Sequence, residues 1–328
     1  MEKFTKFSDP TTGINPFLPR SAGTKGSKIG QSALKIGPIG YIRFILKAPF
    51  VLITLLLWFI LSLLFKITPL GGLIDVVFSK LLLFFFGFWK ITSKKAANTR
   101  GSPPGYEQEK RGEYPKNDTL ILSNHGSFID TLYLISKYHP TFAFIANDYD
   151  VIPDNVTIQT KSGLSALFCD YRNKPLKVSD GITLQEKLHA TTKKIAGPFV
   201  VYFEGTTTNG RSILQPIYSA FKGCQPSSVL ALAFSYSDAT ECTFTTQTPF
   251  AFFISLLSQS GHQLTVAESV PFAKNSKETA DVNFDLVLNH LRLMMCDAAR
   301  AIPAEINIEM KKKMEAYLEE ELKNKIKC

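Results

Sequence analysis

The sequence predicts an α/β fold in which a mixed sheet is flanked by helices, with an N-terminal hydrophobic membrane hairpin ahead of it. Two observations lead to this expectation. Residues 48–65 form an uncharged apolar stretch, and beyond residue 118 short apolar runs alternate with segments that have helical apolar spacing. A chain of 328 residues, 45% of them hydrophobic, is long enough to bury a full core around such a sheet.

The hairpin is predicted over residues 41–92. Residues 48–65 are just long enough to span a bilayer, and a second apolar stretch over residues 67–89 follows a turn that contains Pro69 and Gly71. Lys and Arg flank both outer ends, which places both ends on the cytosolic side. A two-pass or re-entrant hairpin is favoured over a buried helix pair, because a core helix of this length normally has a polar face.

The rest of the chain divides around this hairpin. Residues 1–40 are expected to be an irregular cytosolic tail, 93–117 a linker, 118–302 the main folded domain and 303–328 a charged C-terminal helix. Residues 280–327 as a whole are expected to form two helices broken at Pro303. Strands are expected over residues 119–123, 142–146, 166–170, 199–203, 229–236, 243–247 and 264–270, and helices over residues 131–137, 155–162, 181–195 and 250–257.

Composition narrows the class of partner. A net charge of +9 indicates a polyanionic partner, and the apolar stretch makes a membrane surface or a phosphate-bearing ligand a better match than nucleic acid. The five cysteines are scattered without metal-ligand spacing, so neither a metal site nor a disulfide framework is expected. No secretory signal peptide precedes the first apolar run.

A candidate base lies where the strand over residues 119–123 ends. His125 is followed five residues later by Asp130, across the predicted junction of a strand and a helix. A histidine beside a carboxylate can take a proton from an alcohol near neutral pH, because the carboxylate fixes the tautomer and stabilises the imidazolium. The alternative for this pair alone is that His125 is a satisfied polar residue and Asp130 a helix cap.

A second polar cluster follows the strand over residues 199–203. Glu204, Gly205, Thr206 and Arg211 belong to a segment rich in glycine, hydroxyls and amide groups, a usual means of holding a phosphate. The alternative is a Gly/Thr-rich turn. A strand expected to end at residue 170 would bring Arg172 to the same edge of the sheet.

These motifs occur in a recognisable order. His125-x-x-x-x-Asp130, an arginine after the next block, Glu204-Gly205-Thr206, and then Phe221-Lys222-Gly223 before an apolar strand together resemble the PlsC-like glycerolipid (lysophospholipid) acyltransferase superfamily. The N-terminal residues 12–19, ahead of the hydrophobic stretch, are similar to those of the fungal lysophosphatidic acid:oleoyl-CoA acyltransferases of that superfamily. The chain departs from the usual Phe-Pro-Glu-Gly-Thr, with Tyr202 and Phe203 before Glu204.

The resemblance implies a membrane enzyme that uses acyl-CoA as co-substrate, needs no other cofactor and no metal, and forms phosphatidic acid from lysophosphatidic acid. It further implies that His125 is the general base and Asp130 its orienting partner, and that Arg172, Glu204, Gly205, Thr206 and Arg211 hold the lysolipid phosphate. Membrane lipids are the expected partners, at the endoplasmic reticulum membrane and lipid droplet, with the catalytic domain in the cytosol.

Two alternatives stay open at this point. One is acylation of another lysophospholipid, such as lysophosphatidylcholine or lysophosphatidylethanolamine. The other is a non-catalytic lipid-binding or membrane-trafficking protein on the same scaffold.

Overall fold

The computed structural model describes residues 2–19, 36–65, 68, 70–98, 100–109, 119–146, 156–172, 182–191, 197–237, 242–245, 247–275 and 283–327. Within these ranges the strands are β1 Lys90–Lys95, β2 Tyr106–Gln108, β3 Thr119–Ser123, β4 Thr141–Ile145, β5 Ile158–Ser162, β6 Phe199–Tyr202, β7 Ser212–Ile213, β8 Ser228–Tyr236, β9 Gln263–Glu268, β10 Phe272–Lys274 and β11 Ile302–Pro303. The helices are η1 Glu2–Phe7, α1 Pro38–Leu64, α2 Leu70–Phe86, α3 Phe128–Tyr138, α4 Gly163–Arg172, α5 Leu184–Thr191, η3 Tyr218–Phe221, α6 Pro249–Ser258, α7 Phe284–Ala299 and α8 Ile308–Lys327.

A mixed sheet forms the centre of the fold, as the sequence predicts. Its strands run in the order β1-β9-β8-β3-β6-β4-β5, and β10 joins β8 to β2. The central strands β8, β3, β6 and β4 are parallel, whereas β9 runs antiparallel to β8 and β5 antiparallel to β4. The carboxyl ends of β3 and β6 therefore meet at one edge, where a parallel sheet usually places its functional groups.

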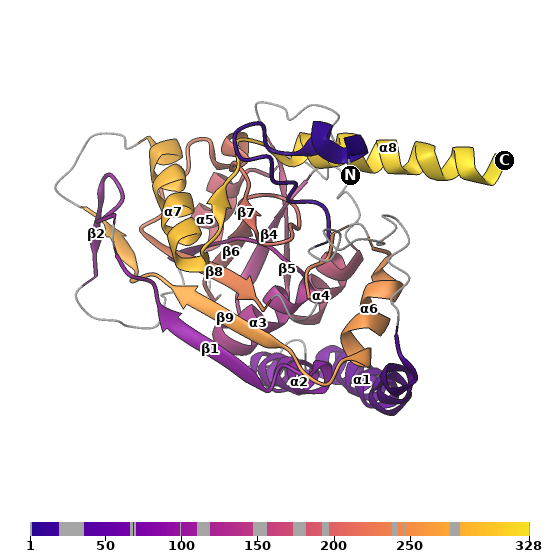
Figure 1. Ribbon diagram of the computed structural model, residues 1–328. Helices are drawn as coiled ribbons and strands as arrows, with labels where there is room; N and C mark the ends of the chain where they lie inside the picture. The colour runs from indigo at the N-terminus through magenta and orange to yellow at the C-terminus, as the bar shows by residue number, and fades with distance from the viewer. Residues whose placement is uncertain are drawn as a thin grey trace.

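The strand side chains alternate between two cores. In β3, Ile121 belongs to the core that also contains side chains of α1, α2, α3, α4 and α6, whereas Leu120 and Leu122 belong to the core that contains side chains of α5 and α7. Such burial of both faces explains why β3 and β6 are continuous apolar runs rather than alternating ones. Figure 1 shows the helices on the two sides of the sheet, with α1 and α2 at its lower edge.

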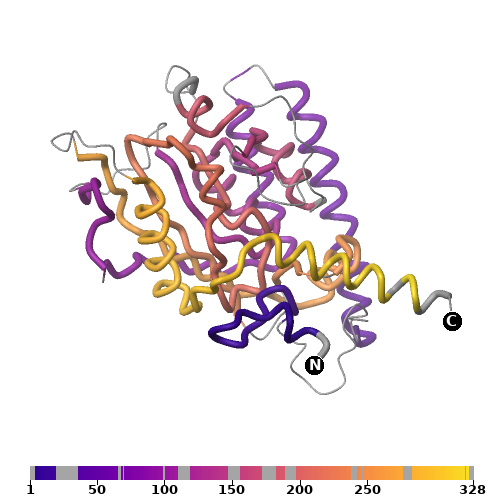
Figure 2. The backbone as a smooth tube through the Cα atoms, turned by 90° about the horizontal axis from the view of Figure 1, so that it is seen from above, coloured from indigo at the N-terminus to yellow at the C-terminus, as the bar shows by residue number. Residues whose placement is uncertain are grey.

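A third, smaller core joins the two ends of the described chain. Phe4, Phe7 and Phe17 pack with Met314 of α8 and with Leu214, and Tyr317 closes the cluster against the two N-terminal phenylalanines. In Figure 2 the N-terminal segment lies beside the start of α8. The expected irregular tail thus contains a 3-10 helix and a segment packed on the main domain.

The hydrophobic N-terminal region forms two helices, of which one is long and apolar enough to cross a membrane. That helix is α1, with 27 residues, and α2, with 17, packs against it. Asp75 of α2 accepts a hydrogen bond from Trp58 Nε1 at 2.7 Å and lies 3.2 Å from His139 Nε2, which ties both helices to the end of α3. A transmembrane hairpin does not follow from this arrangement, because α2 is joined to the sheet domain through this polar contact.

Three predicted elements are wrong. Residues 155–162 were expected to be helical, but Ile158–Ser162 form β5, because their Ile and Thr side chains suit a strand that pairs with β4. Residues 166–170 lie within helix α4 rather than a strand, since Leu164, Leu167 and Tyr171 have helical spacing and pack together on α3 and α2. A strand was expected over residues 243–247, but the described residues of this range are not in a strand.

The other predicted strands and helices of the folded domain are confirmed, most of them with shifted ends, whereas parts of the expected linker over 93–117 belong to strands β1 and β2. The strands at 119–123, 142–146, 199–203, 229–236 and 264–270 correspond to β3, β4, β6, β8 and β9, and the helices at 131–137 and 250–257 to α3 and α6. Of the helix predicted over 181–195, residues 184–191 form α5, and residues 192–195 lie outside the described ranges. The C-terminal pair is present as α7 and α8, interrupted by a short strand that includes Pro303.

Candidate active site

The turn between β3 and α3 is held by a capping box. Ser127 is the N-cap of α3 and its hydroxyl accepts a hydrogen bond from Ile129 N, while Asp130 Oδ2 accepts from Gly126 N at 2.7 Å and Ser127 N at 3.1 Å. Asp130 Oδ1 also accepts from the Tyr236 hydroxyl. The carboxylate of Asp130 therefore holds the turn and also faces the histidine. Asp130 does cap the helix, as the alternative proposed, but capping is not its sole contact.

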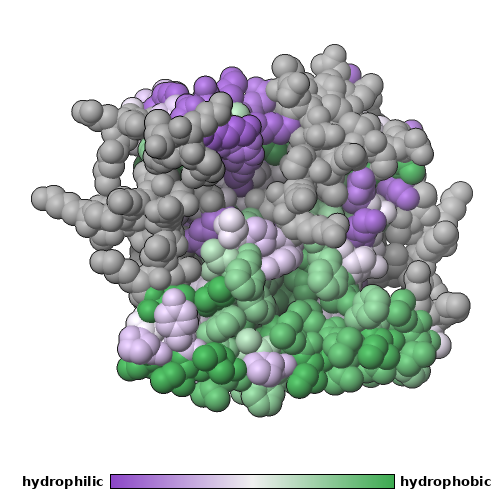
Figure 3. Space-filling model, turned by 90° about the vertical axis from the view of Figure 1, so that its right-hand side faces the viewer, coloured by the Kyte–Doolittle hydropathy of each residue, from purple (hydrophilic) through white to green (hydrophobic). Residues whose placement is uncertain are grey.

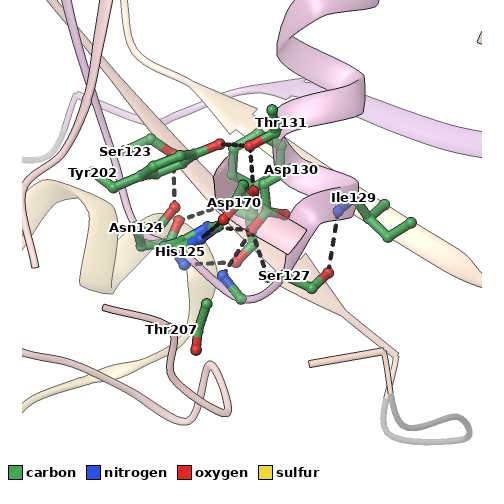
Figure 4. Close-up of polar contacts among 12 residues, drawn as sticks. Ser123, Asn124, His125, Ser127, Ile129, Asp130, Thr131, Asp170, Tyr202 and Thr207 are labelled. Atoms are coloured by element: carbon green, nitrogen blue, oxygen red, sulfur yellow. Dashed lines mark hydrogen bonds and ion pairs between the residues drawn. The ribbon is translucent and has the colours of Figure 1, made fainter. Parts of the chain in front are cut away.

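His125 lies buried in the middle of this turn, between two carboxylates. Its Nε2 is 2.7 Å from Asp170 Oδ1, and its Nδ1 is 3.4 Å from Asp130 Oδ2 (Figure 4). The longer separation is an ion-pair distance, since Nδ1 makes no hydrogen bond within the described residues. Tyr202, one of the two residues that depart from the usual motif, stacks on the imidazole at 3.9 Å between ring centroids.

This environment favours the charged imidazolium. Burial alone would lower the pKa of His125, but the charge of Asp170 and the contacts with both carboxylates outweigh it and raise the pKa to about 9. A histidine in this state is a proton donor at neutral pH. At neutral pH it becomes a base only when one of the two carboxylates no longer faces it.

Asn124 and Glu204 fix the backbone on either side of His125. The Asn124 amide exchanges two hydrogen bonds with the backbone of Phe234 in β8, at 2.7 and 3.0 Å. Glu204 is fully buried and accepts from His125 N at 3.2 Å and from Leu214 N at 2.8 Å. Burial raises the pKa of Glu204 to about 7 although these amides oppose the shift. Its position at the end of β6 is thus explained by a hydrogen-bonding duty.

The Glu204–Asn209 loop is closed by a buried lysine that the sequence did not single out. Lys311 of α8 donates to Thr206 Oγ1 at 2.8 Å, to Thr207 Oγ1 at 2.9 Å and to Thr207 O at 3.0 Å, and is only 3% exposed. Thr208 N in turn donates to His125 O at 2.9 Å. The charged run 311–313 suggested a solvated face, and no local pattern distinguishes its first lysine.

Gly205 allows the backbone conformation of this loop, and Asn209 joins the loop to the N-terminal segment. Gly205 has a positive φ of 67°, and a Cβ there would lie 2.4 Å from Ile217 Cδ1, so only glycine fits. The Asn209 side chain donates to Asn15 O and Leu18 O at 2.9 and 2.8 Å. The N-terminal residues that suggested the fungal branch therefore dock directly on this loop.

The two predicted arginines lie on different elements, at the end of α4 and just before β7. Arg172 is the last residue of α4, and its side chain lies outside the described part of the structure. Arg211 is exposed at the start of β7, and its backbone N–H donates to Asn209 Oδ1 at 3.0 Å. The sequence also missed Asp170, because contact between a helix and a turn 45 positions apart leaves no local pattern.

An apolar pocket of about 250 Å³ opens beside the histidine turn, on the side of α1 and α2. Phe128, the residue after the N-cap of α3, is part of its wall, together with Tyr171 of α4, whose ring meets that of Phe128 edge to face at 5.5 Å. The remaining lining is contributed by Leu52, Leu55, Leu82, Phe86, Leu167, Phe168, Phe250 and Phe253. A hydrocarbon chain is the kind of ligand that such a lining suits.

A fold with a histidine and an aspartate in an H-x4-D turn at the end of a parallel strand, beside an apolar pocket, is the arrangement of a lipid acyltransferase. The chain is 33% identical over 222 residues to a Schizosaccharomyces pombe protein named, provisionally, a lysophosphatidic acid:oleoyl-CoA acyltransferase, with 66% of each chain covered. It is 26% identical over 259 residues to the Arabidopsis thaliana lysophospholipid acyltransferase LPEAT1, covering 73% of this chain and 62% of that protein. The chain thus belongs to the lysophospholipid acyltransferase family and spans about two thirds of the length of these relatives.

Two further comparisons add little. The structure of the 1-acyl-sn-glycerophosphate acyltransferase PlsC from Thermotoga maritima matches 76% of this chain and 96% of its own, with 13% identity and a TM-score of 0.35, too low to support a conclusion. No family model matches the chain.

Proposed function

We propose that the protein transfers an acyl group from acyl-CoA to the free hydroxyl of a lysophospholipid, with lysophosphatidic acid as the acceptor and phosphatidic acid as the product. The observation that carries the proposal is the H-x4-D turn placed against an apolar pocket. The acyl chain would occupy that pocket. The thioester would then lie near His125, because Phe128 belongs both to the pocket wall and to the turn.

In this reaction His125 Nε2 takes the proton of the acceptor hydroxyl as the oxygen attacks the thioester carbonyl. A carbon–oxygen bond forms, the carbon–sulfur bond breaks, and the imidazolium returns its proton to the sulfur of CoA. Asp130, 3.4 Å from Nδ1, holds the ring and stabilises its charge. No other cofactor or metal takes part in this proposal.

The acceptor phosphate would be held at the Glu204–Gly205–Thr206 loop. Its backbone is held rigidly by Glu204 and Lys311, which suits a preorganised anion site. Arg172 and Arg211 are the candidate cations for the phosphate, by the resemblance noted above. Another lysophospholipid, either lysophosphatidylcholine or lysophosphatidylethanolamine, is the second candidate acceptor, because the plant relative is named a lysophospholipid acyltransferase.

The membrane would contact the surface formed by α1 and α2. Most of the exposed large hydrophobic side chains belong to these two helices, among them Ile53, Leu56 and Phe84, each more than half exposed. Figure 3 shows them as a nearly continuous hydrophobic face at the base of the molecule. The cytosolic face of the endoplasmic reticulum or of a lipid droplet is the proposed location.

The contacts of α1 favour a helix that lies in the membrane surface over one that spans it. Near its start Lys47 Nζ donates to Gln259 O at 2.7 Å, and near its end Trp58 bonds Asp75. One side of α1 is thus covered along most of its length, and the other is exposed. A glycosylation acceptor inserted between α1 and α2 tests this. It stays unmodified if both helices lie on the cytosolic surface, and is modified if α1 crosses.

The function is tested by measuring acyl transfer in membranes that contain either the parent chain or His125→Ala. Oleoyl-CoA is offered with lysophosphatidic acid, lysophosphatidylcholine or lysophosphatidylethanolamine. We expect transfer to lysophosphatidic acid by the parent and a loss of about a hundredfold or more in the variant. Equal transfer by the two chains would contradict the mechanism, and no transfer by the parent to any acceptor would favour a non-catalytic lipid-binding role. Preference for a zwitterionic acceptor would change the substrate assignment.

A further inference from the structure

The ring nitrogen that the proposed reaction needs is occupied. Nε2 of His125 is the atom that would receive the hydroxyl proton, and it lies 2.7 Å from Asp170 Oδ1. With Asp130 facing Nδ1 and Asp170 facing Nε2, both nitrogens must carry hydrogen to avoid placing a lone pair against a carboxylate. The histidine turn is thus in a state that cannot accept a proton.

Asp170 is held in this position by a second contact. Thr131 Oγ1 donates to Asp170 Oδ2 at 2.5 Å and lies 2.7 Å from the Tyr202 hydroxyl. The side chain of Asp170 is 5% exposed, so no solvent competes for Nε2. The contact is therefore a built feature of the buried site and not a surface ion pair.

The helix that carries Asp170 also lines the apolar pocket. Leu167, Phe168 and Tyr171 of α4 belong to the pocket wall, on either side of Asp170 in the sequence. A ligand that fills the pocket therefore contacts the helix that carries the carboxylate. The position of α4 and access to Nε2 are therefore mechanically linked.

We propose that Asp170 caps the catalytic histidine in the empty enzyme, and that an acyl chain entering the pocket moves α4 and withdraws the cap. This inference rests on the proposed function and adds a positioning residue to it. Once Asp170 has moved, Nε2 faces the substrate instead of a carboxylate and its proton passes to solvent. Nδ1–H still faces Asp130, and Nε2 has a lone pair with which to accept the hydroxyl proton.

The groups that face His125 are Asp130 of α3, Asp170 of α4, the ring of Tyr202 in β6 and the carboxylate of Glu204 through the His125 N–H. Asp130 and Asp170 both lie on helices that line the pocket, α3 through Phe128 and α4 through Leu167, Phe168 and Tyr171, but Asp130 is also bonded to the backbone of the histidine turn itself.

The first test compares the pH dependence of kcat/KM for the parent, Asp170→Asn and Asp297→Asn. Asp297 pairs with Arg100 on the exposed surface at 2.6 Å and serves as the matched control. In the parent, kcat/KM should rise to a plateau with a midpoint at alkaline pH, and we expect Asp170→Asn to lower the pH of that midpoint by at least one unit. At pH 7 the variant should then reach about a tenfold or larger fraction of its own plateau value than the parent reaches of its plateau value. Asp297→Asn should leave the midpoint in place.

Two outcomes of that test would overturn the cap. An unchanged midpoint in Asp170→Asn would mean that the contact is not present in the enzyme that binds substrate. Loss of activity at every pH, with the fold intact by circular dichroism, would mean that Asp170 acts in the reaction rather than blocking it.

The second test does not depend on turnover and uses a variant only for assignment. The parent chain contains five histidines, so the nitrogen resonances of His125 can be assigned in detergent by comparison with His125→Ala. We expect a charged ring at pH 7.5 without ligand and a neutral one, protonated at Nδ1, once a non-reactive oleoyl thioether of CoA is bound. A ring that stays charged with the thioether bound would refute the withdrawal of Asp170. If the parent chain shows this change in the ring but no acyl transfer, the proposed function is refuted while the proposed withdrawal of Asp170 stands.

Discussion

The pocket beside the histidine turn predicts that acyl-chain selection can be altered from α1. Leu55 lines this pocket, whereas Leu57 lies two residues further along the same helix, about 200° around its axis, and is 46% exposed. Leu55→Trp and Leu57→Trp therefore make the same change in size on opposite faces of α1. Only the first should reduce the space available to a hydrocarbon chain.

The magnitude follows from the cost of leaving methylene groups unburied. If the indole in Leu55→Trp displaces about three methylenes of an oleoyl chain, at about 0.8 kcal/mol each, the loss is about 2.4 kcal/mol, or roughly 60-fold in kcat/KM. A decanoyl chain that does not reach the displaced region should lose less than about threefold. Leu57→Trp should change neither rate by more than about twofold.

The assay is the initial rate of transfer from oleoyl-CoA and from decanoyl-CoA to lysophosphatidic acid, each extrapolated to kcat/KM. The ratio of the two values reports chain selection and cancels differences in expression or membrane content. An equal ratio in the parent and Leu55→Trp would refute the assignment of the pocket to the acyl chain. An equal fall in Leu57→Trp would show that the effect comes from the membrane surface of α1.

Three further predictions concern the supports of the site. Lys311→Met leaves three acceptors in Thr206 and Thr207 without their donor. We expect the free energy of unfolding to fall by about 2–3 kcal/mol and kcat to fall at least tenfold. Lys313 is exposed, so Lys313→Met serves as the control and should change neither value. Glu204 has a pKa of about 7 in the folded chain against a usual value near 4.5, so the folded state binds the extra proton and stability falls as pH rises from about 4.5 to 7, by up to about 3 kcal/mol. Melting curves of Glu204→Gln should lack that slope, and an equal slope in parent and variant would contradict the burial argument. Trp58→Phe removes the hydrogen bond to Asp75 while keeping an aromatic ring against Phe78. It should lower the free energy of unfolding by about 2 kcal/mol and speed proteolysis between α1 and α2. Trp89→Phe, the same change at an exposed indole, should do neither.

The sheet was largely predictable because its central strands are buried on both faces. Runs such as those in β3, β6 and β8 are continuously apolar, and no competing structure would bury them as well. One of the errors falls at the sheet margin. Residues 156–162 mix apolar with polar side chains, so their period fits a helix or a strand, and only pairing with β4 decides between them.

The site was predictable where its parts are local. His125 and Asp130 share one turn, and the capping box that holds them is a short-range pattern. Asp170 and Lys311 were not found because their roles depend on contacts across 45 and 105 positions of the chain. Placing residues 166–170 in a strand also hid Asp170, since a strand would not have set its side chain between the pocket and the imidazole.

Lys311 gives the site an order of assembly. It follows every other residue of the site in the chain, so synthesis on the ribosome produces the hydrophobic helices, the sheet and the histidine turn before the amine that holds Thr206 and Thr207 exists. A growing chain can therefore settle on a membrane while its catalytic loop is still unsupported. Acyl transfer would begin only after α8 has docked, which keeps unfinished chains from consuming activated fatty acids.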